Sequence, residues 1–266
     1  MSDYTKMWSE LGLDLESHDA LLSVLGGAYT DIFLSQKNRP EGMKYFDFVM
    51  SEVHGLRIQE LMDAKAQGRK VIGSYCVFVP EELILAVDGV SVGLCAGAEF
   101  NFEGAETLLP RNTCSLIKSA FGFKLGKVCP YLEASDVVVG ENTCDGKKKS
   151  YELLAPLVKD LYVMDMPQMK SAAGKALLKE EYRRFVAKLE EVSGKKITVD
   201  SLKKAVEVVN AKRKAVKRLA ELRAADPSPI SGLDALLVTQ VFFYDDPVRV
   251  TESVQNLCHE LEERVK

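Results

Sequence analysis

The chain has 266 residues, of which 47% are hydrophobic, and a formal net charge of −4. This length can bury a sizeable core in one large domain or two smaller ones. An acidic balance gives no indication of nucleic-acid binding, which favours a basic face, and no apolar run approaches the length that spans a membrane. The first residues lack the basic region and apolar stretch of an export signal, so we expect a cytoplasmic protein.

The first 66 residues are predicted to form an N-terminal helical cap. Apolar residues recur there at helical spacing, for example around Leu21–Leu25 and Tyr45–Val49. The stretches Gly26-Gly27 and Pro40-Glu41-Gly42 interrupt this pattern and mark turns.

The pattern changes at Lys70, where short apolar runs rich in β-branched residues begin. Such runs are typical of buried parallel strands, and a helix that begins at Pro80 separates the first two. Four strands are expected, at 70–79, 90–95, 136–140 and 161–164. The alternation of strands and helices predicts an α/β fold: a three-layer, Rossmann-like domain with a mostly parallel sheet over residues 67–170.

Residues 171–266 are predicted to be a C-terminal helical segment. Gly194 is placed to end one helix, and Thr198, Ser231 and Asp246 are placed to cap the next three. The domain division expected from the sequence is therefore 1–66, 67–170 and 171–266.

The strongest chemical signal is the tripeptide Asn-Thr-Cys, which ends at Cys114 and again at Cys144. A third cysteine, Cys129, lies midway between them and is followed by Pro130. Asn and Thr favour helix N-caps and Pro favours the first helical position, so each cysteine is expected to open a helix. The positive end of a helix dipole favours a thiolate and any anionic cluster bound to it.

Three thiolates at three helix starts predict a metal or iron–sulfur site. The alternative is that all three are buried structural cysteines, and no C-x-x-C spacing decides between the two. Cys95, at a strand end, is either a further ligand or a buried thiol, and Cys76, inside the first apolar run, is expected in the core. Lys147, Lys148 and Lys149 either offset a negative cluster or form a solvated face.

Six stretches carry a resemblance to a known family. They are residues 79–83 (Val-Pro-Glu-Glu-Leu), 93–97 (Gly-Leu-Cys-Ala-Gly), 111–114 (Arg-Asn-Thr-Cys), 128–131 (Val-Cys-Pro-Tyr), 144–148 (Cys-Asp-Gly-Lys-Lys) and 229–232 (Pro-Ile-Ser-Gly). The chain resembles the 2-hydroxyacyl-CoA dehydratase / benzoyl-CoA reductase superfamily, and within it most closely the double-cubane-cluster anaerobic reductases.

The resemblance implies an oxygen-sensitive iron–sulfur protein whose cluster is a cubane or a double cubane. Cys114 and Cys144 match the pair shared across the superfamily, Cys129 fits the extra ligand of the double-cubane branch, and Cys95 matches a family cysteine of less certain role. The first function expected is a low-potential reductase component. The alternatives are a 2-hydroxyacyl-CoA dehydratase subunit, which works by radical dehydration, and a non-catalytic scaffold or electron-carrier half.

The resemblance also implies partners. Electrons are expected from a separate ATP-dependent activator that carries its own iron–sulfur cluster, and the complete protein is expected to be a homodimer. Family chains continue into a second α/β domain with further cluster cysteines, so we expect either a longer chain or a separate polypeptide to complete the site. The substrate and the nuclearity of the cluster are not indicated.

Overall fold

The computed structural model describes residues 3–94 and 99–265. The chain divides into two compact units. The first comprises Met1–Asp19 and Ile58–Leu202, and the second comprises Ala20–Arg57 and Lys203–Lys266. The second unit therefore combines helices from both ends of the sequence.

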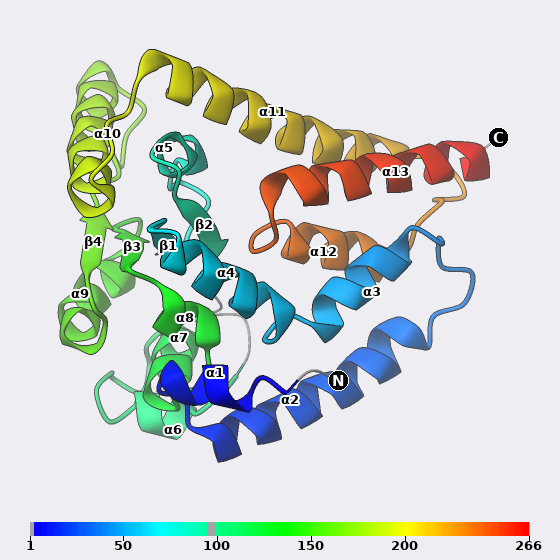
Figure 1. The fold of residues 1–266 in the computed structure, drawn as a ribbon, viewed down its shortest axis with the longest axis horizontal. Helices are drawn as coiled ribbons and strands as arrows, with labels where there is room; N and C mark the ends of the chain where they lie inside the picture. Colours follow the sequence, from blue (N-terminus) through cyan, green and yellow to red (C-terminus); the bar gives the residue numbers. More distant parts are fainter. Residues whose placement is uncertain (1–2, 95–98, 266) are drawn as a thin grey trace. The chain divides into compact units, whose positions relative to one another are not determined.

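The first unit is built on a parallel sheet of four strands (Figure 1). The strands are β1 (Val71–Ser74), β2 (Val90–Gly93), β3 (Val137–Glu141) and β4 (Leu161–Met164). Their order is β2-β1-β3-β4, with Ile72 paired to Val137 and Val138 paired to Leu161. This confirms the predicted α/β fold with a parallel sheet.

The strand order contains a topological switch point. From β1 the chain passes to β2 on one side and then returns to β3 on the other side. The chain therefore leaves the carboxyl ends of β1 and β3 in opposite directions, which opens a crevice where ligands bind in open α/β sheets. Residues that follow these two strands are thus the first place to look for a site.

Helices cover both faces of this sheet and complete three layers. The connecting helices are α5 (Glu81–Ala86), α6 (Phe102–Ala105), α7 (Ser115–Leu125), α8 (Pro130–Ala134) and α9 (Asp145–Leu154), with a 3-10 turn at Ala155–Leu157, and α10 (Ala172–Ser193) follows β4. One core layer joins α5 and α10 to alternate residues of β3, including Val137 and Val139. The other joins α6, α7 and α9 through buried side chains such as Phe121 and Leu154.

The strand that was expected at 70–79 is only partly correct. β1 ends at Ser74, and the chain turns at Cys76, whose carbonyl accepts a hydrogen bond from the Val79 N–H at 3.3 Å. Val77 and Phe78 are exposed, at 70% and 51%. Pro80, which has no N–H to donate to a sheet, is the N-cap of α5, so the apolar run ends in a helix start and not in a strand. Cys76 is consequently not a core residue.

The remaining helices are α1 (Thr5–Glu10), α2 (Leu15–Tyr29), α3 (Met43–Ser51), α4 (Leu56–Ala66), α11 (Val199–Leu222), α12 (Gly232–Val241) and α13 (Pro247–Val265), with a π-helical turn at Thr30–Leu34 after α2. Local signals predicted several of their ends correctly. Gly194 ends α10 with a φ of 69°, and Thr198 Oγ1 accepts a hydrogen bond from the Ser201 N–H at 3.0 Å. Ser231 caps α12 in the same way, and Asp246 caps α13. Among the described helices, none is both long and apolar enough to cross a membrane.

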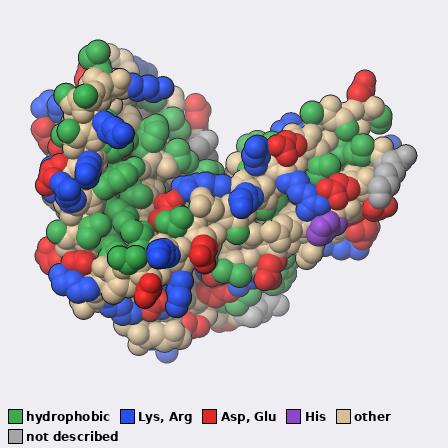
Figure 2. Space-filling model, turned by 90° about the horizontal axis from the view of Figure 1, so that it is seen from above, with side chains coloured by type: hydrophobic (Ala, Val, Ile, Leu, Met, Phe, Trp, Pro, Cys, Tyr) green, Lys and Arg blue, Asp and Glu red, His purple; other side chains and the backbone are tan. Residues whose placement is uncertain are grey.

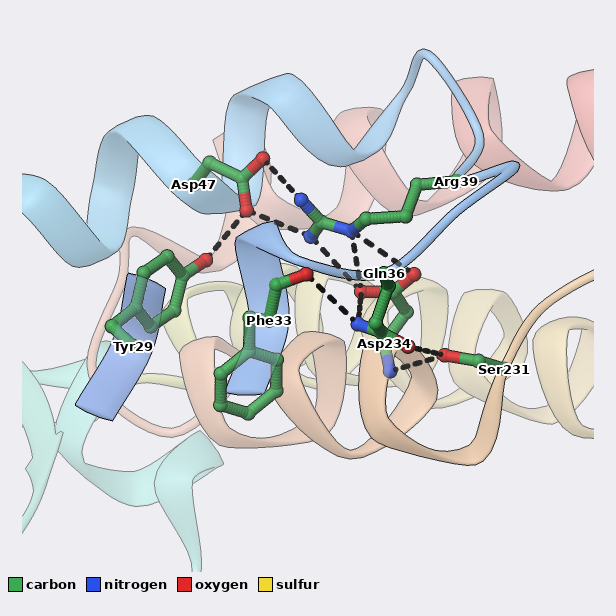
Figure 3. Close-up of polar contacts among 7 residues, drawn as sticks. All are labelled: Tyr29, Phe33, Gln36, Arg39, Asp47, Ser231 and Asp234. Atoms are coloured by element: carbon green, nitrogen blue, oxygen red, sulfur yellow. Dashed lines mark hydrogen bonds and ion pairs between the residues drawn. The ribbon is translucent and has the colours of Figure 1, made fainter. Parts of the chain in front are cut away.

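The second unit holds a buried polar network around Arg39 (Figure 3). The guanidinium donates two hydrogen bonds of 2.8 Å to Asp47 and one of 3.0 Å to Asp234, an acid in the first turn of α12. Tyr29 Oη donates to Asp47 at 2.5 Å, and Gln36 Nε2 donates to Asp234 at 3.1 Å. Burial opposes the charge on Arg39, but these carboxylates raise its pKa above the ordinary value. The network ties the segment after α2 to α12.

Charged side chains of both signs are interspersed on the face drawn in Figure 2. On α11, Lys217 pairs with Glu221 at 3.6 Å, and Arg218 donates to Glu262 of α13. Lys212 lies 4.6 Å from the centre of the Phe242 ring. These three basic residues of α11 are therefore used in pairing and packing within the unit.

Candidate site at the carboxyl end of the sheet

The three cysteines expected at helix starts all lie there. Cys114 is the N-cap of α7, Cys129 is the N-cap of α8, and Cys144 is the N-cap of α9. Cys144 adopts an extended backbone, and its Sγ accepts a hydrogen bond from the Lys147 N–H at 3.5 Å. The prediction from Asn, Thr and Pro signals is thus confirmed for each position.

The three thiols differ in exposure. Cys114 and Cys144 are exposed, whereas Cys129 is buried, with 4% of its surface accessible. The alternative that all three are buried structural cysteines is therefore wrong for Cys114 and Cys144. It stays open for Cys129.

The starts of α7 and α9 lie against each other. A Cβ atom added to Gly146, in the first turn of α9, would lie 2.9 Å from Cδ1 of Ile117 in the first turn of α7. Cys114 and Cys144 each directly precede one of these turns. The fold therefore brings two exposed thiols to adjacent helix starts, although they are thirty positions apart in sequence.

The loop that carries Cys144 follows β3, and a buried carboxylate lies at the end of this strand. Glu141, the last residue of β3, has no accessible surface. Its Oε1 accepts hydrogen bonds from Lys147 Nζ and, at 3.3 Å, from Thr143 Oγ1. Its Oε2 is buried without a hydrogen-bond partner among the described residues. A buried charge with an unpaired oxygen is costly, so this corner is unusual for a strand end.

The three lysines that follow Cys144 have separate roles. Lys147 is partly buried and pairs with Glu141. Lys149 forms a surface pair with Glu152 at 3.0 Å, and Lys148 is exposed. The charge of Lys147 is therefore used within the chain, and only the other two agree with a solvated face.

Cys76 joins this corner, and the sequence interpretation missed it. The thiol is partly buried, and burial raises its pKa, with a further contribution from the negative charge of Glu141. Burial also raises the pKa of Tyr151, and charge at Glu141, Cys76 and Cys144 adds to this effect. Cys76 and Cys144 thus both lie in the surroundings of Tyr151. The signal that could have revealed Cys76 is its position just after the central strand at the switch point.

The described residues fit one part of an iron–sulfur site. Exposed thiols at helix starts are suitable donors for iron and other soft metals. Within residues 3–94 and 99–265, however, no three His, Cys, Asp or Glu side chains lie close enough together to hold a metal ion. Cys95, the fourth expected ligand, lies outside the described residues. The chain therefore presents donors without assembling a complete ligand set among its described residues.

Comparison with known proteins decides the family. Residues 76–266, which include every cysteine of the corner, match the 2-hydroxyglutaryl-CoA dehydratase, D-component family. The chain belongs to this family. The resemblance expected from the cysteine motifs is thereby confirmed at the level of the superfamily, but its double-cubane branch is not.

Three relatives are similar to this chain in sequence over most of its length. The protein YjiM of Escherichia coli is 40% identical over 205 residues, which are 76% of this chain and 53% of YjiM. The (R)-phenyllactyl-CoA dehydratase beta subunit of Clostridium sporogenes is 28% identical over 221 residues, 82% of this chain and 58% of that subunit. The (R)-2-hydroxyglutaryl-CoA dehydratase subunit beta of Acidaminococcus fermentans is 26% identical over 203 residues, 74% of this chain and 52% of that subunit. The chain thus spans about half the length of these relatives.

Proposed function

We propose that this chain is part of a subunit of a 2-hydroxyacyl-CoA dehydratase-type enzyme and that its exposed cysteines hold an iron–sulfur cluster. The observation that carries the proposal is the pair of exposed thiols at the adjacent starts of α7 and α9. The dehydratase names of two relatives support this function better than the double-cubane reductase that was first expected.

Cys114 and Cys144 are the first proposed ligands, because both are accessible and both lie at the positive end of a helix of ten or more residues. Cys95 is proposed as a further ligand. When bound, an iron–sulfur cluster supplies transfer of single electrons. The contribution of this chain is to present the thiols and to place helix dipoles that favour an anionic group.

The double-cubane reductase stays a second proposal, and it depends on Cys129. That function requires Cys129 as an extra ligand, yet its thiol is 4% exposed and opens a helix of only five residues. A cluster at Cys129 would need the loop before α8 to move. The dehydratase proposal needs no such change.

The names of two relatives suggest a partner subunit for this chain. Two relatives are beta subunits of dehydratases, so we propose that a partner subunit contributes the remaining ligands. An ATP-dependent activator with its own iron–sulfur cluster is the proposed electron source, and a homodimer is the alternative to a pair of different subunits. The third alternative is a non-catalytic scaffold or electron-carrier half, and binding to a partner chain without substrate turnover would support it.

Anaerobic iron and sulfide analysis tests the cluster. The chain is reconstituted as wild type, as Cys114→Ser, as Cys144→Ser and as Cys258→Ser, the last being a buried thiol of the second unit and the matched control. We expect the iron content per chain to be lower than in wild type for Cys114→Ser and Cys144→Ser and unchanged for Cys258→Ser. Equal iron in all four proteins would reject Cys114 and Cys144 as ligands. Dehydration of 2-hydroxyacyl-CoA with the reduced activator and a partner subunit then separates a dehydratase from a reductase.

A further inference from the structure

We propose that Glu141 is a positioning residue for Cys144: its buried carboxylate holds both sides of the Cys144 turn and thereby fixes the direction of the thiol. This inference rests on the proposed role of Cys144 as a ligand, and it adds a second group of residues to that site. All the contacts that support it lie within the first unit.

The first step is that one carboxylate oxygen binds the chain before and after Cys144. Thr143 directly precedes the cysteine, and Lys147 is the third residue after it. Both side chains donate to Oε1 of Glu141. The loop and the first turn of α9 are therefore fixed to the same atom, with Cys144 between them.

The second step is that the surrounding backbone is fixed as well. The Glu141 N–H donates to Tyr151 Oη at 3.1 Å, which joins the strand end to the second turn of α9. On the other side, Asn142 Nδ2 donates to Asp165 at 2.5 Å, and Asn142 Oδ1 accepts from the Met166 N–H at 2.7 Å. The segment 141–144 is thus attached both to α9 and to the end of β4. Its freedom to redirect Cys144 is small.

The burial of Glu141 has an energetic cost. A fully buried carboxylate with one unpaired oxygen contributes less to stability than an apolar residue of similar size would. Buried polar groups without hydrogen bonds are expected at functional sites more often than in a hydrophobic core that serves only stability. The Cys114 turn, in comparison, has no side-chain cap bond at the cysteine. The two cysteine turns are therefore held differently, and of the two only the Cys144 turn has a hydrogen bond to its thiol.

Two backbone amides report directly on this turn. The Lys147 N–H donates to Cys144 Sγ, and the Lys148 N–H donates to the Cys144 carbonyl at 3.0 Å. Amide hydrogen exchange at these positions measures how firmly Cys144 is held. It can be read in the metal-free chain, so the outcome does not depend on whether a cluster binds.

The test compares Glu141→Gln with wild type by hydrogen exchange resolved to residues 145–149. We expect exchange at the Lys147 and Lys148 amides to accelerate about ten-fold, the effect of losing roughly one hydrogen-bonded anchor. Lys147→Arg should retain protection, because the guanidinium also donates to the carboxylate. Glu152→Gln, which breaks only the exposed pair on the same helix, is the matched control and should change nothing.

A second variant keeps the proposal testable if Glu141→Gln does not fold. The double variant Glu141→Gln with Lys147→Met removes both charges together, which a core tolerates better than removal of one. It should fold and still lose protection at the Lys148 amide. In each folded variant that carries Glu141→Gln, the ratio of Cys144 to Cys114 alkylation at one fixed pH should differ from wild type by about three-fold or more, because the thiol is redirected.

Unchanged exchange at Lys147 and Lys148 in a folded variant that carries Glu141→Gln would overturn the positioning role. That result is distinct from failure of the proposed function. Loss of protection together with no iron binding by wild type would leave Glu141 as a holder of the turn but would reject the cluster.

Discussion

Replacement of Arg39 by Met should destabilise the second unit strongly. The Arg39 side chain is 13% exposed, and its two partners Asp47 and Asp234 are 23% and 1% exposed. Met has a similar stem but cannot donate to either carboxylate. The variant therefore leaves two carboxylates close together with no cation between them (Figure 3).

The size of the effect follows from burial. Removal of one partner from a buried ion pair costs about 3–5 kcal/mol, because a charge remains buried without compensation. Gln36 still donates to Asp234, and Asp47 is partly hydrated, so we expect a loss near the lower limit, about 3 kcal/mol. Lys217→Met is the matched control in the same unit, where both side chains of the pair are largely exposed, at 77% and 64%. Its cost should be under about 0.5 kcal/mol.

Urea unfolding followed by far-UV circular dichroism measures both variants, and hydrogen exchange in α12 locates the change. In Arg39→Met, the amides at the start of α12 should lose protection first, because Asp234 lies in its first turn. A loss of less than about 1 kcal/mol would show that the network is screened like a surface pair, which would refute the reasoning from burial.

Three further outcomes are expected. Gly140→Ala should lower the free energy of unfolding by about 1–3 kcal/mol, because the new Cβ would lie 2.3 Å from Cζ of Tyr151; an unchanged melting temperature would contradict this packing. Gly27→Ala, in α2 with nothing within 4 Å of the new Cβ, should raise the free energy of unfolding by about 0.5–1 kcal/mol in the same thermal assay. Cys76 should be alkylated slowly at neutral pH, and its alkylation should accelerate only at a pH above the ordinary pKa of a thiol, since burial raises the pKa of Cys76. Mass spectrometry of iodoacetamide-treated, metal-free protein measures this rate, and rapid alkylation of Cys76 at neutral pH would contradict the prediction.

The raised pKa of Cys76 also has a consequence for stability. The folded state holds the thiol proton more tightly than the unfolded state does, so this contribution is present below the unfolded pKa. It is lost as the pH rises through the pKa of the unfolded thiol and towards that of the folded one. Cys76→Ser should therefore reduce the loss of stability on the alkaline side, which urea midpoints at neutral and alkaline pH would measure.

The sequence by itself determined the features that depend on neighbouring residues. The helix starts at Cys114, Cys129 and Cys144 were predictable because an N-cap involves only the next few residues. The end of α10 at Gly194 and the strand at Leu161–Met164 were also predictable, because a helix-ending glycine and a short apolar run are local features of the sequence. The family, too, could be recognised from short motifs around these cysteines.

Only the tertiary structure decided which of these local features meet. The strand order places Cys76 and Cys144 on either side of the switch point, and no spacing in the sequence indicates that order. Glu141 reads as an ordinary polar strand end, and its burial results from packing by α9 and Tyr151. Exposure of Cys144 and burial of Cys129 were equally undecided, because both follow similar capping signals. Capping energy acts over a few residues, whereas burial and charge pairing depend on segments far apart in sequence, and these set the chemistry of the corner.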